Sequence, residues 1–337
     1  MRGLRVAVLG ATGLVGETIL RVLEERRTPV SRLLPLATEG RGRHVEFRGQ
    51  TVPVEAVDTV NWRDVDVAFF AASNAASERY APEAASYGVT VIDKSSFFRM
   101  NPEVPLIVPE VNLQKAGDAR IIASPNCSTI QLVVALNPLR LQFGITRAIV
   151  STYQAVSGTG REAVETLRQE SQAALEEGRL TVASTTSPYP VPIAFNVLPY
   201  CDRFMDDGYT GEEWKLTRET AKIWGEELAL TATAVRVPVY VGHSESVYIE
   251  TQSDFTVEEA RQCLAEAPGI KLVDSPERGL VPTPWEVAGQ DLVLVGRVRK
   301  DLFQARGMHL FVVGDNLRKG AATNAVQIME GLSHRWR

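Results

Sequence analysis

The chain has 337 residues, of which 45% are hydrophobic and 23% are charged, and its formal net charge is −5. This length fits about two domains, and the composition is that of an ordinary globular protein that needs no disulfide or metal ion to fold. The negative charge argues against a dedicated nucleic-acid-binding protein, and the absence of any apolar run of about 18 residues excludes a transmembrane span.

The cysteines and histidines predict neither a disulfide framework nor a metal site. There are three cysteines and four histidines, and no CxxC or HExxH spacing occurs among them. The N-terminus also lacks a signal-peptide pattern, so we expect a cytoplasmic protein without membrane or nucleic-acid partners.

Strands and helices alternate over the first third of the chain. The series begins with an apolar run, Leu4–Leu9, typical of a parallel strand buried on both faces. Further strands are predicted at Arg32–Leu36, Val65–Phe70, Val89–Asp93 and Arg120–Ala123, and helices at Glu17–Glu25 and Ala75–Tyr87. The alternation predicts an α/β fold with a Rossmann-type, doubly wound parallel sheet.

The chain after Pro125 is richer in strands. A helix is predicted at Ser128–Phe143, kinked or broken near Pro138, followed by a long strand at Ile145–Gln154. Further helices are predicted at Arg161–Glu177, Glu212–Leu228, Val257–Ala267 and Leu317–Leu332, strands at 231–237, 245–251, 292–299 and 308–313, and an irregular excursion at 178–210. This pattern predicts an α+β domain with a mostly antiparallel sheet.

Three glycines at the end of the first strand indicate a dinucleotide site. Gly10, Gly13 and Gly16 lie between this strand and a helix, where the backbone can approach a pyrophosphate and the helix N-terminus favours an anion. The alternative is that the glycines only allow close packing of helix and strand. The segment after the second strand would contact the ribose, and it holds both Glu39, which suits NAD, and Arg41, which suits NADP.

Cys127 is the candidate nucleophile. It lies where a strand ends and a helix begins, a position that favours the thiolate. A lone cysteine is otherwise often a small buried apolar residue, and Cys263 on the apolar face of a helix fits that alternative. Cys201 has no comparable setting, and we expect it to be non-catalytic.

Three further polar residues occur at chemically informative places. Gln154 ends a strand just before a glycine-rich turn, where its amide could orient a substrate. Arg236 interrupts an apolar strand, and a buried guanidinium requires a carboxylate or phosphate partner. His243 follows a glycine at the start of a strand and could move protons near neutral pH, or it could be a structural histidine.

Together these segments resemble the aspartate-β-semialdehyde dehydrogenases. The motifs that carry the resemblance are GATGLVG at 10–16, SSFFRM at 95–100, SPNCST at 124–129, YQAVSGTG at 153–160, EEWK at 212–215, RVPVYVGHSESV at 236–247 and DNLRKGAATNAVQI at 315–328. The resemblance covers essentially the whole chain. It implies the reversible NADP-dependent reduction of aspartyl phosphate to aspartate semialdehyde and phosphate, in lysine, threonine and methionine biosynthesis, by a homodimer or dimer of dimers.

The resemblance also implies domains and residue roles. The dinucleotide-binding domain would comprise residues 1–126 and 315–337, and the catalytic and dimerisation domain 127–314. Cys127 would be the acylated nucleophile, His243 the acid–base residue and Gln154 the residue that positions the substrate. The substrate would be bound through its carboxylate by Arg236, its ammonium by Glu212, and its phosphoryl group by Arg99 and Lys215. The dinucleotide would contact Gly10, Thr12, Gly13, Leu14, Val15, Gly16, Glu39, Gly40, Arg41, Ser157, Gly158 and Asn316.

The sequence departs from the family pattern at two places. Lys94 stands where the family commonly has asparagine. The family's serine–arginine pair that contacts the cofactor is replaced by Thr38, Glu39 and Gly40, with Arg41 and Arg43 displaced from its position. Glu39 would repel the 2′-phosphate of NADP unless these arginines compensate, so NAD is also a candidate cofactor.

Two other functions stay open from the sequence alone. An N-acyl-glutamyl-phosphate reductase would share the thioester chemistry but would not need Glu212 near a free ammonium group. A non-catalytic dinucleotide sensor would keep the glycine loop but would have no use for Cys127, Gln154, Arg236 and His243 together.

Overall fold

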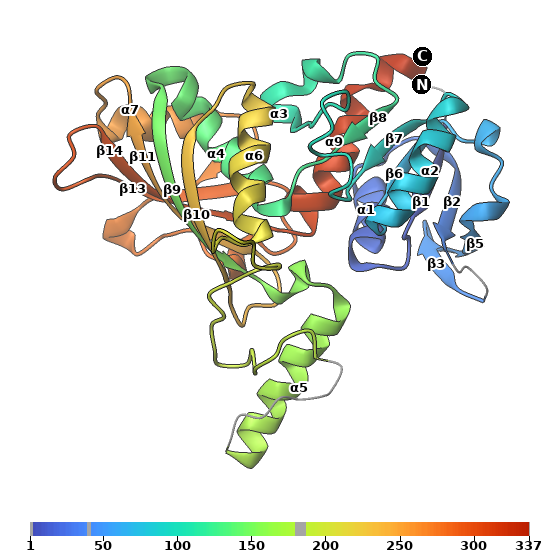
Figure 1. Ribbon diagram of the computed structural model, residues 1–337, viewed down its shortest axis with the longest axis horizontal. Coiled ribbons are helices and arrows are strands. Elements are labelled where there is room, and N and C mark those ends of the chain that lie inside the picture. Colours follow the sequence, from blue (N-terminus) through green and yellow to red (C-terminus); the bar gives the residue numbers. More distant parts are fainter. Residues whose placement is uncertain (1–2, 39–41, 179–186, 337) are drawn as a thin grey trace. The chain divides into compact units, whose positions relative to one another are not determined.

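A computed structural model describes residues 3–38, 42–178 and 187–336. The chain forms two compact units (Figure 1). Unit 1 comprises Met1–Asn126, Lys222–Trp224 and Ala321–Arg337, and unit 2 comprises Cys127–Ala221 and Gly225–Gly320. Within the described stretches, no helix is long and apolar enough to cross a membrane.

Unit 1 is built on a six-stranded sheet with the order β5-β2-β1-β6-β7-β8, in which every pair is parallel. Its strands are β1 (Leu4–Leu9), β2 (Val30–Ala37), β5 (Glu55–Ala56), β6 (Val67–Phe70), β7 (Thr90–Asp93) and β8 (Ile121–Ala123). A separate hairpin, not foreseen from the sequence, joins β3 (His44–Phe47) and β4 (Gln50–Pro53).

Helices pack on this sheet through apolar side chains. The helices of unit 1 are α1 (Leu14–Glu25), α2 (Asn74–Ser86), α3 (Pro109–Asn112) and α9 (Thr323–Gly331). Val6 and Val8 of β1, Ile19 of α1 and Val326 of α9 are buried in one hydrophobic core. The parallel sheet confirms the predicted Rossmann-type part of the fold.

Unit 2 contains a second six-stranded sheet, with the order β10-β9-β11-β14-β13-β12. Its strands are β9 (Ile145–Gln154), β10 (Ala229–Arg236), β11 (His243–Thr251), β12 (Ile270–Leu272), β13 (Val293–Lys300) and β14 (Gly307–Gly314). The inner pairs are antiparallel, whereas β10 and β12 pair parallel with their neighbours at the two edges. The predicted mostly antiparallel second sheet is confirmed.

The alternation of side chains along β9 separates the two faces of this sheet. Val150, Thr152 and Gln154 are buried, whereas Ile149 and Tyr153 are exposed. The buried face packs against α4 (Cys127–Phe143) and α7 (Val257–Glu266). Gln154 therefore points to the same side of the sheet as α4.

The sequence predicts that this helix is kinked or broken near Pro138, and helix α4 continues through the proline to Phe143. Most of its side chains are buried, so tertiary packing offsets the hydrogen bond that the proline cannot donate. The predicted C-terminal helix is two segments, a π-helix at Arg318–Ala322 and then α9.

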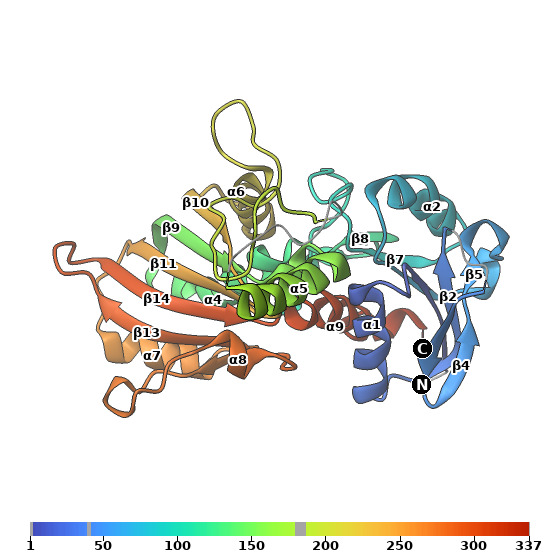
Figure 2. The same cartoon turned by 90° about the horizontal axis from the view of Figure 1, so that it is seen from below.

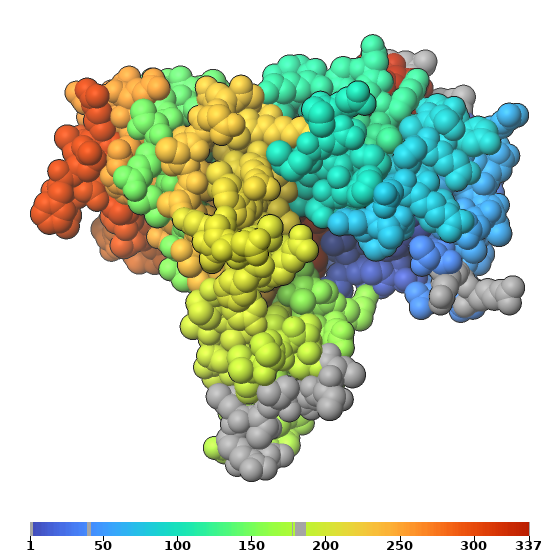
Figure 3. Space-filling model, viewed as in Figure 1, coloured from blue at the N-terminus to red at the C-terminus, as the bar shows by residue number. Residues whose placement is uncertain are grey.

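Helix α5 (Arg161–Glu177) projects from the sheet of unit 2 in Figure 1 and in the space-filling view of Figure 3, whereas in Figure 2 it is seen from below, in front of the sheet. Residues from 187 onward pack against it. The Glu170 carboxylate accepts hydrogen bonds from the backbone N–H groups of Ile193 and Ala194, at 2.7 and 3.1 Å. From residue 187 to 210 this segment has no helix or extended strand, as predicted for the excursion.

Unit 2 also holds α6 (Gly211–Trp224), whose last three residues cluster with unit 1, and α8 (Pro284–Val287). Short 3₁₀ turns of the chain lie at Val57–Thr59, Trp62–Asp64, Leu113–Ala116, Val156–Gly158, Pro276–Arg278 and Ser333–Trp336.

Candidate active site

In the glycine loop of unit 1, Gly10 and Gly16 are in close contact with neighbouring backbone, whereas Gly13 has free space around it. A Cβ at Gly16 would lie 2.1 Å from Gly10 O, and a Cβ at Gly10 would lie 2.3 Å from Ala71 O. At Gly13, which caps α1, a Cβ would meet its nearest neighbour at 3.4 Å, and the residue is exposed. Gly16 thus lets α1 pack closely on the end of β1, and Gly10 lets Ala71, which follows β6, approach the turn. The amides at the start of α1 remain for an anion.

The neighbouring residues Thr12, Leu14 and Val15 are partly exposed around this turn. This arrangement fits a dinucleotide phosphate, because the backbone is open at Gly13 and no carboxylate side chain comes from the loop itself. Glu39, Gly40 and Arg41, which we expect to contact the ribose, lie outside the described residues.

Cys127 is the first residue of α4. It is partly exposed, and a Cβ at Gly320 would lie 3.0 Å from the Cys127 Cβ. The sulfur is thus at a helix N-terminus with backbone packed closely on one side, a setting that stabilises a thiolate. In contrast, burial raises the pKa of Cys201 to about 12 and also raises the pKa of Cys263.

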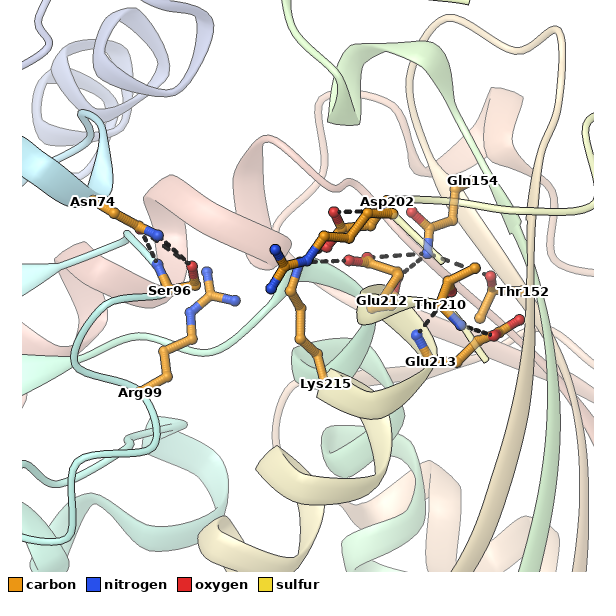
Figure 4. A network of polar contacts seen from close by, with 12 residues as sticks. Asn74, Ser96, Arg99, Thr152, Gln154, Asp202, Thr210, Glu212, Glu213 and Lys215 are labelled. Carbon is orange, nitrogen blue, oxygen red and sulfur yellow. Dashed lines mark hydrogen bonds and ion pairs between the residues drawn. The ribbon is translucent and has the colours of Figure 1, made fainter. Parts of the chain in front are cut away.

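Gln154 connects the start of α4 to α6. Its Nε2 donates to Ser128 Oγ at 2.9 Å. It also donates to Thr152 Oγ1 at 3.3 Å and to Glu212 Oε1 at 3.2 Å (Figure 4). Ser128 follows the cysteine directly, and Glu212 is buried. The amide of Gln154 is therefore fixed one residue from the candidate nucleophile.

Lys215 lies between two carboxylates. Its Nζ is 2.7 Å from Asp202 Oδ2 and 3.1 Å from Glu212 Oε2 (Figure 4). Burial works against its charge, but the two carboxylates more than compensate, so the pKa of Lys215 is raised. Lys215 is a cation at neutral pH, and Glu212 and Asp202 are its counterions.

Arg236 ends β10 and is buried, as predicted from its position in an apolar strand. Its Nη1 donates to Ala155 O at 2.7 Å. Among the described residues the guanidinium pairs with no carboxylate, which leaves most of its N–H groups for a ligand. A Cβ at Gly158 would lie 3.0 Å from Arg236 Nη1, so a side chain at residue 158 would crowd the guanidinium.

The imidazole of His243 is completely buried, and its tautomer follows from one contact. The backbone N–H of Ala155 donates to Nδ1 at 3.0 Å, so the proton of the neutral ring is on Nε2. Nε2 has no hydrogen-bond partner within the described part of the chain. Burial, and then the nearby Arg236 guanidinium, holds the pKa of His243 well below its usual range. At neutral pH the ring is therefore an uncharged N–H donor.

Next to the backbone carbonyl of His243 lies a buried polar pair, Gln131 and Glu245, that sequence reasoning missed. Gln131 Nε2 donates to the backbone carbonyl of His243 at 3.2 Å. Gln131 Oε1 and both oxygens of Glu245 have no hydrogen-bond partner among the residues described. Burial raises the pKa of Glu245 well above its usual range, against an opposing contribution from Gln131. A neutral carboxyl group can donate to the glutamine oxygen, which a carboxylate cannot.

Asn316 holds the glycine-rich turn after β9. Its Nδ2 donates to Ser157 Oγ at 2.9 Å, and its Oδ1 accepts from the Gly242 N–H at 2.9 Å. Ser157, Gly158 and Asn316, which we expect to contact the dinucleotide, are thus brought together within unit 2. They also lie beside His243, since a Cβ at Gly158 would be 3.1 Å from His243 Nε2.

The candidate phosphate-binding residue Arg99 lies in unit 1 and is buried. Its Nη2 donates to Lys94 O at 2.8 Å. Lys94 Nζ donates to Ser124 Oγ at 3.0 Å and Pro125 O at 3.2 Å, so this departure from the family pattern fixes the chain just before Asn126. Nearby, Asn74 Oδ1 accepts from the Ser96 N–H at 3.0 Å (Figure 4).

Comparison with known proteins identifies the family. Residues 5–119 match the model of the semialdehyde dehydrogenase NAD binding domain, and residues 136–319 that of the semialdehyde dehydrogenase dimerisation domain. The chain is 48% identical over 334 residues to an aspartate-semialdehyde dehydrogenase of Aquifex aeolicus, with 97% of each chain covered. The chain belongs to the aspartate-semialdehyde dehydrogenase family.

Further members of this family agree over the full length. A Bacillus subtilis aspartate-semialdehyde dehydrogenase is 47% identical, with 98% of each chain covered. The crystal structure of aspartate semialdehyde dehydrogenase II complexed with ASA from Vibrio cholerae has a TM-score of 0.95 and 44% identity, with 100% of each chain covered. These matches confirm the predicted family, and with it an oxidoreductase with a dinucleotide-binding domain.

Within this family member, the structure brings together the predicted residues of unit 2. Cys127, Gln154, Arg236 and His243 are linked through Ser128, Gln131 and Ala155. Asp202, Gln131 and Glu245 were not singled out from the sequence. No local pattern pointed to Glu245, because its neighbours His243, Ser244 and Ser246 are polar and do not indicate that this strand position is buried.

Proposed function

We propose that this chain catalyses the reversible NADP-dependent reduction of L-aspartyl-4-phosphate to L-aspartate 4-semialdehyde and phosphate, in lysine, threonine and methionine biosynthesis. The observation that carries this proposal is the connected set in unit 2. It comprises a cysteine at a helix N-terminus, a neutral N–H donor at His243 and an arginine that pairs with no carboxylate among the described residues. Hydrogen bonds of Ala155, Gln131 and Ser128, the last of which follows Cys127 in the chain, connect these groups. The names of the relatives support the choice of substrate.

Cys127 is the nucleophile of the proposed reaction. Its thiolate forms a bond to the carbonyl carbon of the acyl phosphate, and the bond from that carbon to the phosphate oxygen breaks. Phosphate leaves with the electron pair, and the acyl group stays on the cysteine as a thioester. The helix N-terminus favours the thiolate that begins and ends the cycle.

We propose that His243 acts as a hydrogen-bond donor, which departs from the acid–base role predicted from the sequence. Negative charge develops on the carbonyl oxygen during acyl transfer and again when the thioester is reduced, and Nε2–H can stabilise it. Collapse of the reduced adduct gives the aldehyde and the thiolate without a net proton transfer to the ring. This role suits an imidazole whose pKa is lowered and whose Nδ1 already accepts the Ala155 N–H.

The substrate's charged groups are matched by buried partners. We assign its carboxylate to Arg236, through a two-pronged hydrogen bond, and its ammonium to Glu212. Gln154 orients the substrate from its fixed position beside Ser128. Arg99 and Lys215 are assigned to the phosphoryl group. A substrate with an acylated amine would leave the buried Glu212 without a cationic ligand group, which disfavours the N-acyl-glutamyl phosphate.

The dinucleotide is assigned to the turn Gly10–Gly16 and to Ser157, Gly158 and Asn316. Bound there, it supplies the hydride, or accepts it in the reverse direction. The open backbone at Gly13 and the amides of α1 suit its pyrophosphate. We also propose that Glu39, Gly40 and Arg41 contact the ribose, with NADP as the main cofactor and NAD as the alternative. The protein is proposed to work as a cytoplasmic homodimer.

Phosphate-dependent oxidation of the semialdehyde, assayed in parallel with NADP and NAD, tests the reaction and the cofactor together. Turnover that requires phosphate and a dinucleotide supports the proposal. Turnover of N-acyl-glutamate semialdehyde in preference to aspartate semialdehyde contradicts the substrate, and dinucleotide binding without any turnover would indicate the sensor instead.

Replacing the sulfur tests the nucleophile. Cys127→Ser is expected to lower kcat by about three orders of magnitude or more, because an alcohol at this position is far less ionised than a thiol. Dinucleotide binding and the unfolding midpoint should be retained. Cys263→Ser is the matched control, with turnover near that of the parent; comparable activity in the two variants would remove Cys127 from the mechanism.

A further inference from the structure

One lysine of unit 1 donates hydrogen bonds to three backbone carbonyl groups in the segment that carries Arg99. Lys222, in the last turn of α6, donates from Nζ to Arg99 O at 2.6 Å, Asn101 O at 2.6 Å and Val104 O at 2.8 Å. An ammonium group has three N–H donors, so these bonds match its full capacity. All of these residues belong to the same compact unit.

The three carbonyl groups are turned toward one point by this contact. Within the segment, Asn101 N–H donates to Phe98 O at 3.0 Å and Val104 N–H to Asn101 O at 3.1 Å, which makes two successive turns. Converging carbonyl dipoles repel one another unless a cation lies between them, and bonds to a charged donor are stronger than neutral ones. Lys222 therefore stabilises the particular backbone shape of residues 99–104.

One of the three carbonyls belongs to Arg99 itself, and this is what connects Lys222 to a ligand. The Arg99 side chain is buried, and its Nη2 donates to Lys94 O at 2.8 Å. The guanidinium is thus held at its tip, and the backbone from which it extends is held by Lys222. A shift of that backbone would displace the guanidinium from any phosphoryl group that it binds.

We propose that Lys222 is a positioning residue for phosphate, acting through Arg99. The inference rests on the proposed function, in which Arg99 binds the phosphoryl group of the acyl phosphate or the phosphate ion. Lys222 itself has no role in acyl transfer, so its effect should be confined to the phosphate step.

Steady-state kinetics in the direction of aldehyde oxidation test this proposal. For Lys222→Met we expect the KM for inorganic phosphate to rise about tenfold or more, since misplacement by about 1 Å is costly for a positioned group. The KM for the aldehyde should stay within about twofold. Lys222→Gln, which keeps two N–H donors, should give a smaller rise and serves as the test if the methionine variant does not fold.

Lys115→Met is the matched control. Lys115 donates from Nζ to Ile223 O at 2.9 Å, so it contacts the same end of α6 but not residues 99–104. Its KM for phosphate should remain that of the parent. A change in general stability alone would affect both lysine variants and both substrates.

A double variant separates positioning from a merely structural effect. If Lys222 acts through Arg99, the double variant Arg99→Met with Lys222→Met should have the same KM for phosphate as Arg99→Met alone. If the two residues act independently, the increases in KM of the two single variants should multiply in the double variant. Multiplied effects, or a parent-like phosphate KM in folded Lys222→Met and Lys222→Gln, overturn the inference while the proposed function stands. An unchanged phosphate KM in Arg99→Met also overturns it. Turnover that needs no phosphate in the parent enzyme contradicts the proposed function itself.

Discussion

The Arg236 side chain is buried, and within the described part of the chain its hydrogen-bond partner is one backbone carbonyl, so its remaining donors are available to a ligand. Arg236→Lys keeps the charge but cannot make two parallel bonds to a carboxylate. We expect kcat/KM for the semialdehyde to fall about 10- to 100-fold, equivalent to about 1.4–2.7 kcal/mol, mainly through KM. Steady-state kinetics measures this, with Arg218→Lys as a control on α6. An unchanged kcat/KM would refute the carboxylate role.

Glu245 should make stability depend on pH. Burial raises its folded-state pKa above the unfolded value, so its stabilising contribution is complete below about pH 4.5. That contribution is lost as the pH rises from there toward the folded-state pKa. Glu245→Gln cannot titrate and can still donate to Gln131 through its amide.

We therefore expect the variant to gain stability relative to the parent as the pH rises, by about 1.4 kcal/mol per pH unit within that window. Denaturant unfolding at several pH values gives this difference. Glu55→Gln, at an exposed side chain, is the control and should show no such trend. If the difference for Glu245→Gln is also flat, the carboxyl group is ionised in the folded protein.

At the scale of elements, the glycines of the β1–α1 turn have different roles: Gly16 allows close packing, whereas Gly13 leaves the backbone open for a ligand. In Gly16→Ala the new Cβ would lie 2.1 Å from Gly10 O, so helix and strand must move apart. We expect a loss of about 2 kcal/mol or more in the free energy of unfolding. Gly13→Ala meets ordinary contact at 3.4 Å and should change stability by less than about 1 kcal/mol. Denaturant unfolding compares the two variants; equal losses would show that Gly13 is also a packing residue.

The helices and strands that could be predicted from the sequence are those with a local signal, such as a continuous apolar run. The start of α4 at Cys127 follows from a strand that ends just before it, and buried strands such as β1 follow from continuous apolar runs. Pro138 predicts a kink or a break because a proline cannot donate the helical hydrogen bond. The burial of its neighbours Leu136 and Leu139, which supports the helix there, depends on the fold and has no local sequence signal. The contacts of Gln131 with His243 and of Lys222 with Arg99 join residues more than 100 positions apart in the chain, so no local pattern reveals them.

At the scale of the whole molecule, one face of the second sheet carries exposed apolar side chains. Ile149 and Tyr153 are exposed there, and the Tyr153 ring stacks on Phe311 with centroids 6.3 Å apart. The matching family model is described as a dimerisation domain. We propose that a second copy of the chain covers this face, because exposed apolar side chains grouped on one surface mark an interface.

Charged substitutions on this face test that proposal. The parent should sediment at about twice the chain mass of 37.0 kDa, and the double variant Ile149→Asp with Tyr153→Asp should sediment as a single chain. Phe303→Asp is the control, since this side chain is 96% exposed outside the sheet face. A double variant that keeps the mass of the parent would place the interface elsewhere.

The functional division predicted from the sequence, residues 1–126 and 315–337 for the dinucleotide and 127–314 for catalysis and dimerisation, stays a prediction. The compact units follow it except at residues 222–224, which cluster with unit 1, and at 315–320, which cluster with unit 2.

Two of the proposed catalytic side chains are oriented by the same backbone residue, Ala155. The Ala155 N–H faces the imidazole, and the Ala155 carbonyl faces the guanidinium. Both are main-chain atoms, so only proline among the natural replacements could delete the first and none could delete the second. A side-chain substitution other than proline at residue 155 therefore leaves the relative orientation of the imidazole and the guanidinium unchanged. Substrate preference can evolve through the surrounding side chains while this orientation is kept.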